Sequence, residues 1–323
     1  MYYFEELNEK INLEIEKISF LQKPENLYLP ILYTLSNKGK RIRPLLCIMA
    51  TELFGGKYED IFEVAMGIEI FHNFTLLHDD IMDNSVLRRG QPTVHKKWNN
   101  NVALLSGDAM TILAYQYITK AKNNLLEILR TFSEAALQVC EGQQYDMDFE
   151  ISLDISESNY LKMIELKTAV LLATSLKIGA ISANAKKVDC ENIYKFGINL
   201  GLAFQLQDDF LDTYGNPEKF KKILGGDIVS NKKTFLLIKT LELADSKLKK
   251  ELLYWLNLKT FNNEEKISIV KKIYDMLEVN KFSEKLINSY FVEANKNLMA
   301  INANTKYKEN FIDFIEVLKS RNY

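Results

Sequence analysis

The stretch FGINLGLAFQLQDDFLD, residues 196–212, is an uncharged run that ends in an acidic cluster. Within it Gln205, Asp208, Asp209 and Asp212 have the spacing i, i+3, i+4 and i+7, which places them on one face of a helix. The preceding turns are apolar on all sides, so this helix is expected to be buried. Carboxylates at the end of a buried helix need partners, because an unpaired buried charge is unfavourable.

A second acidic cluster, HDDIMD at residues 78–83, ends another apolar segment. Asp79 and Asp83 are i and i+4 on a helix, with Asp80 beside Asp79, and such like charges repel unless a cation binds them. Hard oxygen ligands favour Mg²⁺, which usually combines one or two carboxylates with substrate phosphates. One cluster of this kind can be a solvated helix end, but two indicate a phosphate-bearing ligand held through Mg²⁺.

The composition restricts both the fold class and the partners. The chain has 323 residues, and 41 Lys and Arg against 43 Asp and Glu give a net charge of −2, so no strong field attracts nucleic acid or acidic membranes. With 13 Gly and 5 Pro, it has too few turn residues for a β-sandwich or barrel. Apolar residues recur at helical spacing almost everywhere, and we find no convincing strand alternation. The sequence therefore predicts an all-α fold.

No change in composition divides the chain into two halves. Pro44 stands in the first turn of a predicted helix, as proline commonly does. The polar connectors at Asn99–Asn101, Asp154–Asn159 and Asn262–Glu265 are short, and none resembles a domain linker. We therefore predict a single domain over residues 1–323.

Three features bear on the cellular location. The longest run without a charged side chain falls well short of the roughly 20 residues of a membrane helix, so no membrane span is expected. The N-terminus begins Met-Tyr-Tyr-Phe-Glu-Glu and lacks the basic start of a signal peptide. Cys47, Cys140 and Cys190 are widely separated and odd in number, which predicts neither disulfides nor a thiolate metal site. These features favour the cytoplasm.

Two basic segments can bind the expected phosphates. Gly39-Lys40-Arg41-Ile42-Arg43-Pro44 leads into a helix, and Leu87-Arg88-Arg89-Gly90 follows the first acidic cluster. Lysine offers a point charge and arginine a planar fork to phosphate oxygens, so both suit a diphosphate.

The motifs together resemble the trans-type polyprenyl (isoprenyl diphosphate) synthases. The matching motifs, in order, are Gly39-Lys40-Arg41, Asp79–Asp83, Arg88-Arg89-Gly90, Gly107-Asp108, Lys167-Thr168, Phe204-Gln205, Asp208–Asp212 and Gly225-Gly226-Asp227. This resemblance implies a single-domain, all-α isoprenoid synthase bundle around a deep apolar cavity, with the acidic clusters at its mouth. It also implies a homodimer.

The resemblance implies a prenyl transfer reaction. An allylic diphosphate (dimethylallyl, geranyl or farnesyl) binds through more than one Mg²⁺ ion and ionises, and the double bond of isopentenyl diphosphate attacks the resulting cation. Mg²⁺ neutralises the departing diphosphate, and a dry cavity protects the cation from water.

The resemblance also implies roles for individual residues. The metal ligands would be Asp79, Asp80, Asp83, Asp208, Asp209 and Asp212. The isopentenyl diphosphate site would comprise Lys40, Arg43, His72 and Arg89. The allylic diphosphate site would comprise Arg88, Lys167, Thr168, Gln205, Lys222 and Lys232. The catalytic group among these would be Asp79, Asp83, Lys167, Thr168, Gln205 and Asp208.

The sequence departs from the family pattern at two phosphate loops. A Gly-Lys pair is usual where this chain has Lys221-Lys222, and a second is usual where it has Asn231-Lys232. Since the lysines remain, only the tightness of these loops is affected.

Phe74 and Thr75 are expected to set the product length from the cavity floor, one helical turn before Asp79. An aromatic residue at the first of these positions resembles short-chain members of the family. A small second residue and an acidic motif without an insertion favour geranylgeranyl diphosphate, with farnesyl diphosphate next.

Three other functions remain as alternatives. A terpene cyclase also uses an aspartate-rich motif, but it has no second diphosphate site. A metal phosphohydrolase of the HD type would use His78-Asp79, yet only His72 and His95 remain as further histidines. A non-catalytic subunit of a heteromeric synthase would have lost motif aspartates, and all six are present here.

Overall fold

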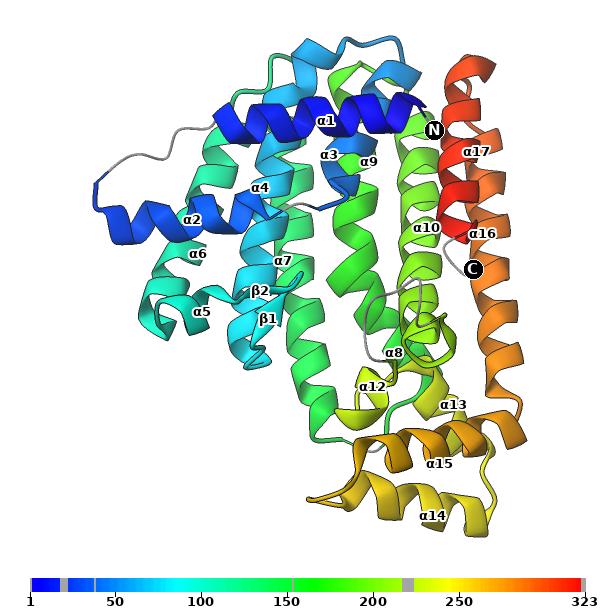
Figure 1. Cartoon of the computed structure of the whole chain (residues 1–323). Helices are drawn as coiled ribbons and strands as arrows, with labels where there is room; N and C mark the ends of the chain where they lie inside the picture. The colour runs from blue at the N-terminus through cyan, green and yellow to red at the C-terminus, as the bar shows by residue number, and fades with distance from the viewer. Residues whose placement is uncertain (1, 18–22, 38, 153, 217–223, 321–323) are drawn as a thin grey trace. The chain divides into compact units, whose positions relative to one another are not determined.

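The computed structural model describes residues 2–17, 23–37, 39–152, 154–216 and 224–320 (Figure 1). Proximity of Cα atoms divides the chain into two compact units, which are described separately. The first unit comprises Met1–Glu134, Thr174–Ile193 and Ala303–Tyr307, and the second comprises Ala135–Ala173, Tyr194–Asn302 and Lys308–Tyr323. Most described residues are helical, so the all-α prediction is confirmed.

The elements of the first unit are α1 (Tyr2–Lys17), α2 (Glu25–Ser36), α3 (Ile42–Leu53), α4 (Tyr58–Met82), β1 (Leu87–Arg88), β2 (Gln91–Pro92), α5 (Val94–Lys97) and α6 (Asn100–Ile118). Those of the second are α8 (Glu157–Ile164), the π-helical turn η1 (Glu165–Ala169), α12 (Gly226–Val229), α13 (Phe235–Leu243), α14 (Ser246–Asn257), α15 (Asn263–Met276) and α16 (Val279–Met299). Unit boundaries fall within α7 (Leu125–Glu150), α9 (Val170–Ser182), α10 (Lys187–Tyr214) and α17 (Thr305–Lys319), and another lies between Asn302 and Ala303.

Helix α4 is buried along most of its length because its sequence is apolar on nearly every side. Ile61, Ile68 and Phe71 are buried, and the helix packs against α3 and α6. The contact with α6 is close, since a Cβ atom at Gly67 would lie 2.9 Å from the carbonyl oxygen of Ala114. The acidic residues at the end of α4 therefore stand on a rigid support.

The second unit has its own apolar core. Helices α13, α14 and α15 pack together through side chains that include Leu237, Leu252 and Ile273. On α10 the predicted burial is confirmed, because Phe196 is fully buried and its ring meets that of Phe311 edge-on at 5.5 Å. This helix carries the second acidic cluster.

Each of the predicted polar connectors leads directly into a helix and supplies the residue that caps it. Asn99 accepts a hydrogen bond from the backbone N–H of Val102 (2.9 Å), so α6 begins at once. Asn262 caps α15 in the same way through Glu265 (3.1 Å). Ser156 likewise caps α8. The first backbone N–H groups of a helix have no partner within the helix, and the oxygen of a short polar side chain can accept a hydrogen bond from one of them.

The described residues contain one short hairpin that the sequence did not predict. Strands β1 and β2 pair antiparallel, with Leu87 opposite Pro92 and Arg88 opposite Gln91. The two turn residues, Arg89 and Gly90, have φ of 53° and 77°, which is the twist that a two-residue hairpin favours.

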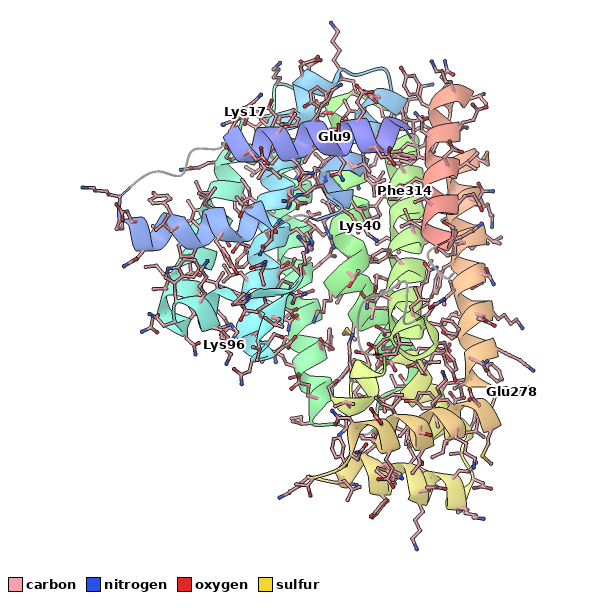
Figure 2. All side chains as sticks on the ribbon, viewed as in Figure 1. Glu9, Lys17, Lys40, Lys96, Glu278 and Phe314 are labelled. Carbon is pink, nitrogen blue, oxygen red and sulfur yellow. The ribbon has the colours of Figure 1, made fainter. Side chains whose placement is uncertain are left out.

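The molecular surface follows the expected pattern for charged residues. Glu9 and Lys17 on α1 are exposed, whereas Ile11 and Ile15 of the same helix are buried (Figure 2). Across the parts of the chain that the structure describes, no helix combines the length and the apolar character needed to cross a membrane. Cys47, Cys140 and Cys190 are all free thiols.

Candidate active site

The first acidic cluster lies at the C-terminal end of α4, in the first unit. The backbone N–H of Asp83 donates to the carbonyl oxygen of Asp79 (2.9 Å), so these two residues are helical neighbours as predicted. Asp83 is exposed and Asp79 is partly buried, whereas Asp80 between them is only 5% exposed. The three carboxylates thus differ in their access to solvent.

Arg88 is the cation that neutralises the buried Asp80. Its Nε and Nη2 atoms donate to Asp80 Oδ1 at 3.0 and 2.6 Å, and Nη2 lies 3.5 Å from Asp79 Oδ2. Arg88 lies on β1, the element that follows α4 in the chain. Burial raises the pKa of Asp80, and the neighbouring Arg88 opposes that shift.

Arg43 and His72, two of the residues predicted to bind isopentenyl diphosphate, are in contact. Arg43 Nη1 donates to His72 Nε2 at 3.0 Å. Since arginine can only donate, His72 accepts through Nε2 and is neutral. Burial, followed by the charge of Arg43 and other nearby arginines, lowers the pKa of His72 well below its usual range.

Arg89 and Lys40 complete this predicted group. The guanidinium of Arg89 donates to the carbonyl oxygen of Asn37 (3.0 Å) and covers Gly39, where a Cβ atom would lie 2.5 Å from Arg89 Nη1. Lys40, which follows Gly39 in the chain, is exposed (Figure 2). The structure therefore brings the two basic segments of the sequence together.

A buried ion pair that the sequence analysis missed holds the basic loop. Arg41 has a left-handed backbone (φ 46°), and its Nη1 donates to Glu69 Oε1 at 2.7 Å. Both side chains are almost fully buried, and Asn73 also donates to Glu69 Oε1 (2.9 Å). The position of Glu69 within an apolar helix was the available signal, because a buried carboxylate there requires a cationic partner.

A small cavity of about 20 Å³ lies in the first unit next to these groups. Its wall includes Asn73, Asp80, Arg88 and Arg89. This volume suits a single water-sized group. The deep apolar cavity that the family resemblance implies remains a prediction.

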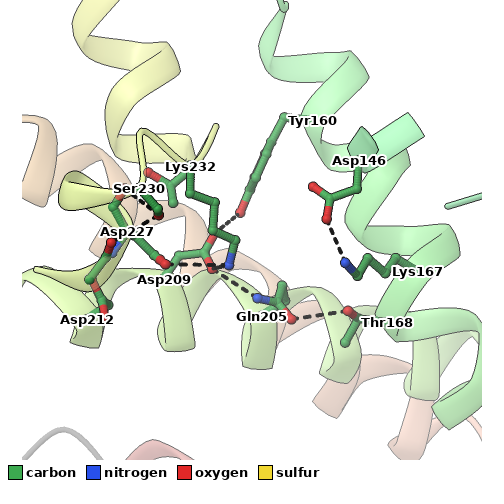
Figure 3. Close-up of polar contacts among 12 residues, drawn as sticks. Asp146, Tyr160, Lys167, Thr168, Gln205, Asp209, Asp212, Asp227, Ser230 and Lys232 are labelled. Carbon is green, nitrogen blue, oxygen red and sulfur yellow. Dashed lines mark hydrogen bonds and ion pairs between the residues drawn. The ribbon is translucent and has the colours of Figure 1, made fainter. Parts of the chain in front are cut away.

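The second acidic cluster lies near the end of α10, in the second unit (Figure 3). Asp208 is exposed, whereas Asp209 is 3% exposed and accepts three hydrogen bonds. The donors are the Tyr160 hydroxyl (2.6 Å), Gln205 Nε2 (2.9 Å) and Lys232 Nζ (3.4 Å). The negative charge of Asp209 is the main reason that the pKa of Lys232 is raised.

Asp212 is joined to the loop that precedes Lys232. Its Oδ2 accepts from the backbone N–H of Asp227 (2.8 Å), and its carbonyl oxygen accepts from that of Gly225 (2.6 Å). Burial raises the pKa of Asp227 to about 7, while Lys232, 3.7 Å away, opposes the shift. The conformation of this loop therefore depends on α10.

Lys167 and Thr168 lie on the π-helical turn η1. Lys167 Nζ donates to Asp146 Oδ2 at 2.6 Å, and the Thr168 hydroxyl donates to Gln205 Oε1 at 3.1 Å (Figure 3). Because Gln205 uses its NH₂ group on Asp209, its carbonyl oxygen must face Thr168. A chain of hydrogen bonds thus links η1 to the acidic cluster.

Two glycines allow helices to approach η1 closely. A Cβ atom at Gly142 of α7 would overlap the backbone nitrogen of Lys167. A Cβ atom at Gly201 of α10 would lie 2.5 Å from the Cα atom of Ala169. Gly142 is therefore needed for close packing, and α7 continues through it without a break. A π-helical turn such as η1 often occurs at a functional site.

The two clusters share one arrangement. In each, the second aspartate is buried and paired with a cation, and the first and last carry carboxylates that are more accessible. In the described residues no group of three or more His, Cys, Asp or Glu side chains is gathered to hold a metal ion by itself. This donor set fits Mg²⁺ that completes its coordination with phosphate oxygens.

The remaining predicted residues are Lys222, Phe74 and Thr75. Lys222 lies outside the described residues. Phe74 stacks edge-on against His78 at 4.7 Å, and Thr75 donates to the carbonyl oxygen of His72 (2.7 Å). The sequence analysis did not identify Tyr160, whose buried hydroxyl takes Asp209 as its hydrogen-bond partner.

Comparison with known proteins identifies the family of the chain. A sequence profile of the family described as Polyprenyl synthetase matches residues 24–277. The geranylgeranyl diphosphate synthase of Sulfolobus acidocaldarius is 36% identical over 324 residues, covering 99% of this chain and 92% of its own length. The short chain isoprenyl diphosphate synthase of Methanocaldococcus jannaschii is 38% identical over 267 residues, covering 82% and 81%.

A solved structure is similar over its whole length. The crystal structure of a geranylgeranyl pyrophosphate synthase has a TM-score of 0.93 and 42% identity, and the match covers 99% of both chains. The chain therefore belongs to the polyprenyl synthetase family.

Proposed function

We propose that the protein condenses isopentenyl diphosphate with an allylic diphosphate in a Mg²⁺-dependent reaction and releases geranylgeranyl diphosphate. Its family makes the chain a prenyltransferase. The observation that carries the proposal is the arrangement of the two acidic clusters, each with accessible carboxylates beside an aspartate that holds a cation.

Asp79, Asp83, Asp208 and Asp212 are the residues that would hold Mg²⁺ in this proposal. Mg²⁺ supplies charge neutralisation for the departing diphosphate. Asp80 and Asp209 have another role: they orient Arg88 and Lys232, because their oxygens already accept from these cations. This division refines the sequence prediction, which grouped all six aspartates as metal ligands.

The remaining residues bind the allylic diphosphate and stabilise the cation that it forms. Arg88, Lys167 and Lys232 carry positive charges that favour the leaving diphosphate. The oxygens of Thr168 and Gln205 are the negative ends of the hydroxyl and amide dipoles, which stabilise positive charge. Lys167 is held by Asp146 and Gln205 by Asp209, so none of these groups has to reorganise during ionisation.

Arg43, His72, Lys40 and Arg89 would bind isopentenyl diphosphate. His72 is neutral and hydrogen-bonded to Arg43, so it adds no competing charge and keeps the guanidinium in place. Arg89 is fixed over Gly39. Binding energy for this substrate thus comes from basic groups that are distinct from the acidic clusters.

Geranylgeranyl diphosphate is the product that we favour. Phe74 stands one turn before Asp79 on α4, where an aromatic ring limits the length of a growing chain. The relative from S. acidocaldarius is named for the same product.

The proposal extends to the assembly and location of the protein. We infer a homodimer formed through α6, because Leu104, Leu105 and Ile112 on this helix are 45%, 61% and 62% exposed. We also propose that residues 1–323 act as one catalytic domain in the cytoplasm. Three free thiols agree with a reducing compartment.

An assay with labelled isopentenyl diphosphate tests this function. Incorporation of label into an acid-labile product should require both an allylic diphosphate and Mg²⁺. A terpene cyclase would instead convert the allylic diphosphate alone, and a non-catalytic subunit would convert neither substrate. Either of these results would overturn the proposal.

A further inference from the structure

Lys266 on α15 is a buried cation without a carboxylate partner in the described part of the chain. Its side chain is fully buried, and its Nζ donates to Asn231 Oδ1 at 2.6 Å and to the carbonyl oxygen of Val229 at 3.2 Å. The ring of Phe261 lies 4.1 Å from Nζ. Burial lowers the pKa of Lys266. A buried ammonium that binds only neutral oxygens is unfavourable for stability, so its presence needs a reason.

Asn231 is the residue that Lys266 holds, and it has a left-handed backbone. Its φ is 58°, in the left-handed region that glycine adopts freely and asparagine tolerates better than most residues. Its Oδ1 accepts from Lys266, and its Nδ2 donates to the carbonyl oxygen of Leu256 (2.9 Å). Both ends of the amide are therefore used to fix a left-handed turn.

Lys232 follows this turn directly. Its backbone N–H donates to the carbonyl oxygen of Asp227 (2.9 Å), and its Nζ reaches Asp209 Oδ1 (3.4 Å). The other end of the loop also rests on α15, because a Cβ atom at Gly225 would lie 2.7 Å from the Ile267 side chain. Helix α15 thus supports the loop at both ends through adjacent residues.

We infer that Lys266 is a positioning residue for Lys232: through the side chain of Asn231 it fixes the turn that aims Lys232 at the allylic diphosphate. The inference rests on the proposed function, in which Lys232 binds that diphosphate. Asn231 alone can adopt the turn, but the chain around a non-glycine residue with positive φ needs a further contact to remain in one conformation. Lys266 supplies that contact from a buried helix.

Four variants test the inference: Lys266→Met, Asn231→Gly, the double variant, and Val270→Ala as a control. Methionine keeps the volume of the lysine stem and removes its charge. Glycine keeps the left-handed turn and removes the amide. Val270 is a buried residue of the same helix, so its truncation destabilises α15. It leaves in place the groups that form the hydrogen bonds from Lys266 to Asn231 and Val229.

Steady-state kinetics should separate positioning from stability. Lys266→Met and Asn231→Gly should each raise the KM for the allylic diphosphate about tenfold and leave the KM for isopentenyl diphosphate unchanged. The double variant should resemble the single variants, because both remove the same contact. Val270→Ala should lower the melting temperature and leave both KM values unchanged. An unchanged allylic KM in Lys266→Met, or an equal rise in Val270→Ala, would overturn the inference.

Calorimetric binding of inorganic diphosphate with Mg²⁺ distinguishes this inference from the proposed function. Weaker binding in Lys266→Met than in Val270→Ala supports the inference even if the wild-type protein forms no prenyl product, a result that overturns only the proposed function. Wild-type protein that forms product while Lys266→Met binds diphosphate normally overturns only the inference. Wild-type protein that binds no diphosphate overturns both.

Discussion

Asp208 and Asp209 are adjacent in sequence and lie in opposite environments. Asp208 is exposed, and Asp209 is buried against Tyr160, Gln205 and Lys232. A carboxylate with accessible oxygens can bind a metal, whereas one whose oxygens already accept hydrogen bonds orients its donors. Identical substitutions at the two positions should therefore have different consequences.

Asp208→Asn should lower kcat about a thousandfold, because a lost metal ligand removes about 4 kcal/mol of transition-state stabilisation. Its melting temperature should stay at the wild-type value. Asp209→Asn should instead lower the free energy of unfolding by about 2 kcal/mol, through loss of charged hydrogen bonds. Assays of turnover and urea unfolding on both variants check this, and near-normal turnover in Asp208→Asn would refute its role as a ligand.

His72 should make stability depend on pH. Its pKa in the folded protein lies below the unfolded value of about 6.5, owing to burial and to the charges of Arg43, Arg89, Arg41 and Arg88. On acidification the unfolded chain therefore takes up a proton at His72 before the folded protein does. The contribution of His72 to the free energy of unfolding is fully present above about pH 6.5 and is lost as the pH falls below it.

Urea unfolding of wild type and His72→Gln at several pH values measures this contribution. Below about pH 6.5, the free energy of unfolding of the wild type should fall more steeply than that of the variant, by up to about 1.4 kcal/mol per pH unit. Parallel slopes for the two proteins would show that His72 is protonated in the folded state.

Among the helices and strands, the sequence predicted best those whose apolar residues follow a helical pattern over many residues. The apolar run before Asp208 predicted a buried helix, and α10 is one. Helix starts were missed at Asn99 and Asn262, because an asparagine between two helical patterns reads equally well as a loop or a cap. The hairpin at Arg89 was missed because two-residue strands have no periodicity to detect.

Contacts between distant segments could not be predicted for the candidate site. The sequence supplied the aspartates, but it did not indicate that Asp80 and Asp209 are paired with Arg88 and Lys232. Such pairings depend on which side chains the helices bring together, and no local pattern encodes that. For the same reason the sequence did not identify Tyr160 as a partner of Asp209.

The π-helical turn η1 gives a prediction about an element. Gly142→Ala places a methyl group against the backbone of Lys167, so η1 must shift and carry Lys167 away from Asp146. We expect the kcat/KM for the allylic diphosphate to fall at least about tenfold. Gly67→Ala is the matched control, because it crowds α6 at Ala114 and does not touch η1.

Kinetics and thermal unfolding of both glycine variants provide the comparison. Both should be destabilised by about 1–3 kcal/mol through overpacking. Equal losses of kcat/KM in the two variants would mean that stability, and not the position of Lys167, accounts for the effect.

For the whole molecule, the exposed apolar face of α6 predicts association. A charge at Leu105 or Ile112 should disrupt a twofold interface, because the same surface of both subunits meets there and the two introduced charges would repel each other. Sedimentation velocity should give a dimer for the wild type and a monomer for Leu105→Glu. Val292→Glu, at a position 65% exposed on α16, should remain a dimer. A dimer in both variants would place the interface elsewhere.

The length of the product is a second property of the whole molecule. Phe74→Ala removes a ring that packs against Phe71 (5.3 Å between ring centres) and His78 on α4. The space that it leaves should accept a longer prenyl chain, so the product should gain at least one five-carbon unit. An unchanged product from this variant would show that another residue limits chain length.

Chromatography of the dephosphorylated product of the wild-type protein, with isopentenyl and allylic diphosphates, tests the proposed reaction most directly. In the presence of Mg²⁺ the main product should be the twenty-carbon alcohol geranylgeraniol, and chelation of the metal should abolish it. Recovery of only the unextended allylic alcohol, or of a cyclic hydrocarbon, would contradict the proposal that this protein makes geranylgeranyl diphosphate.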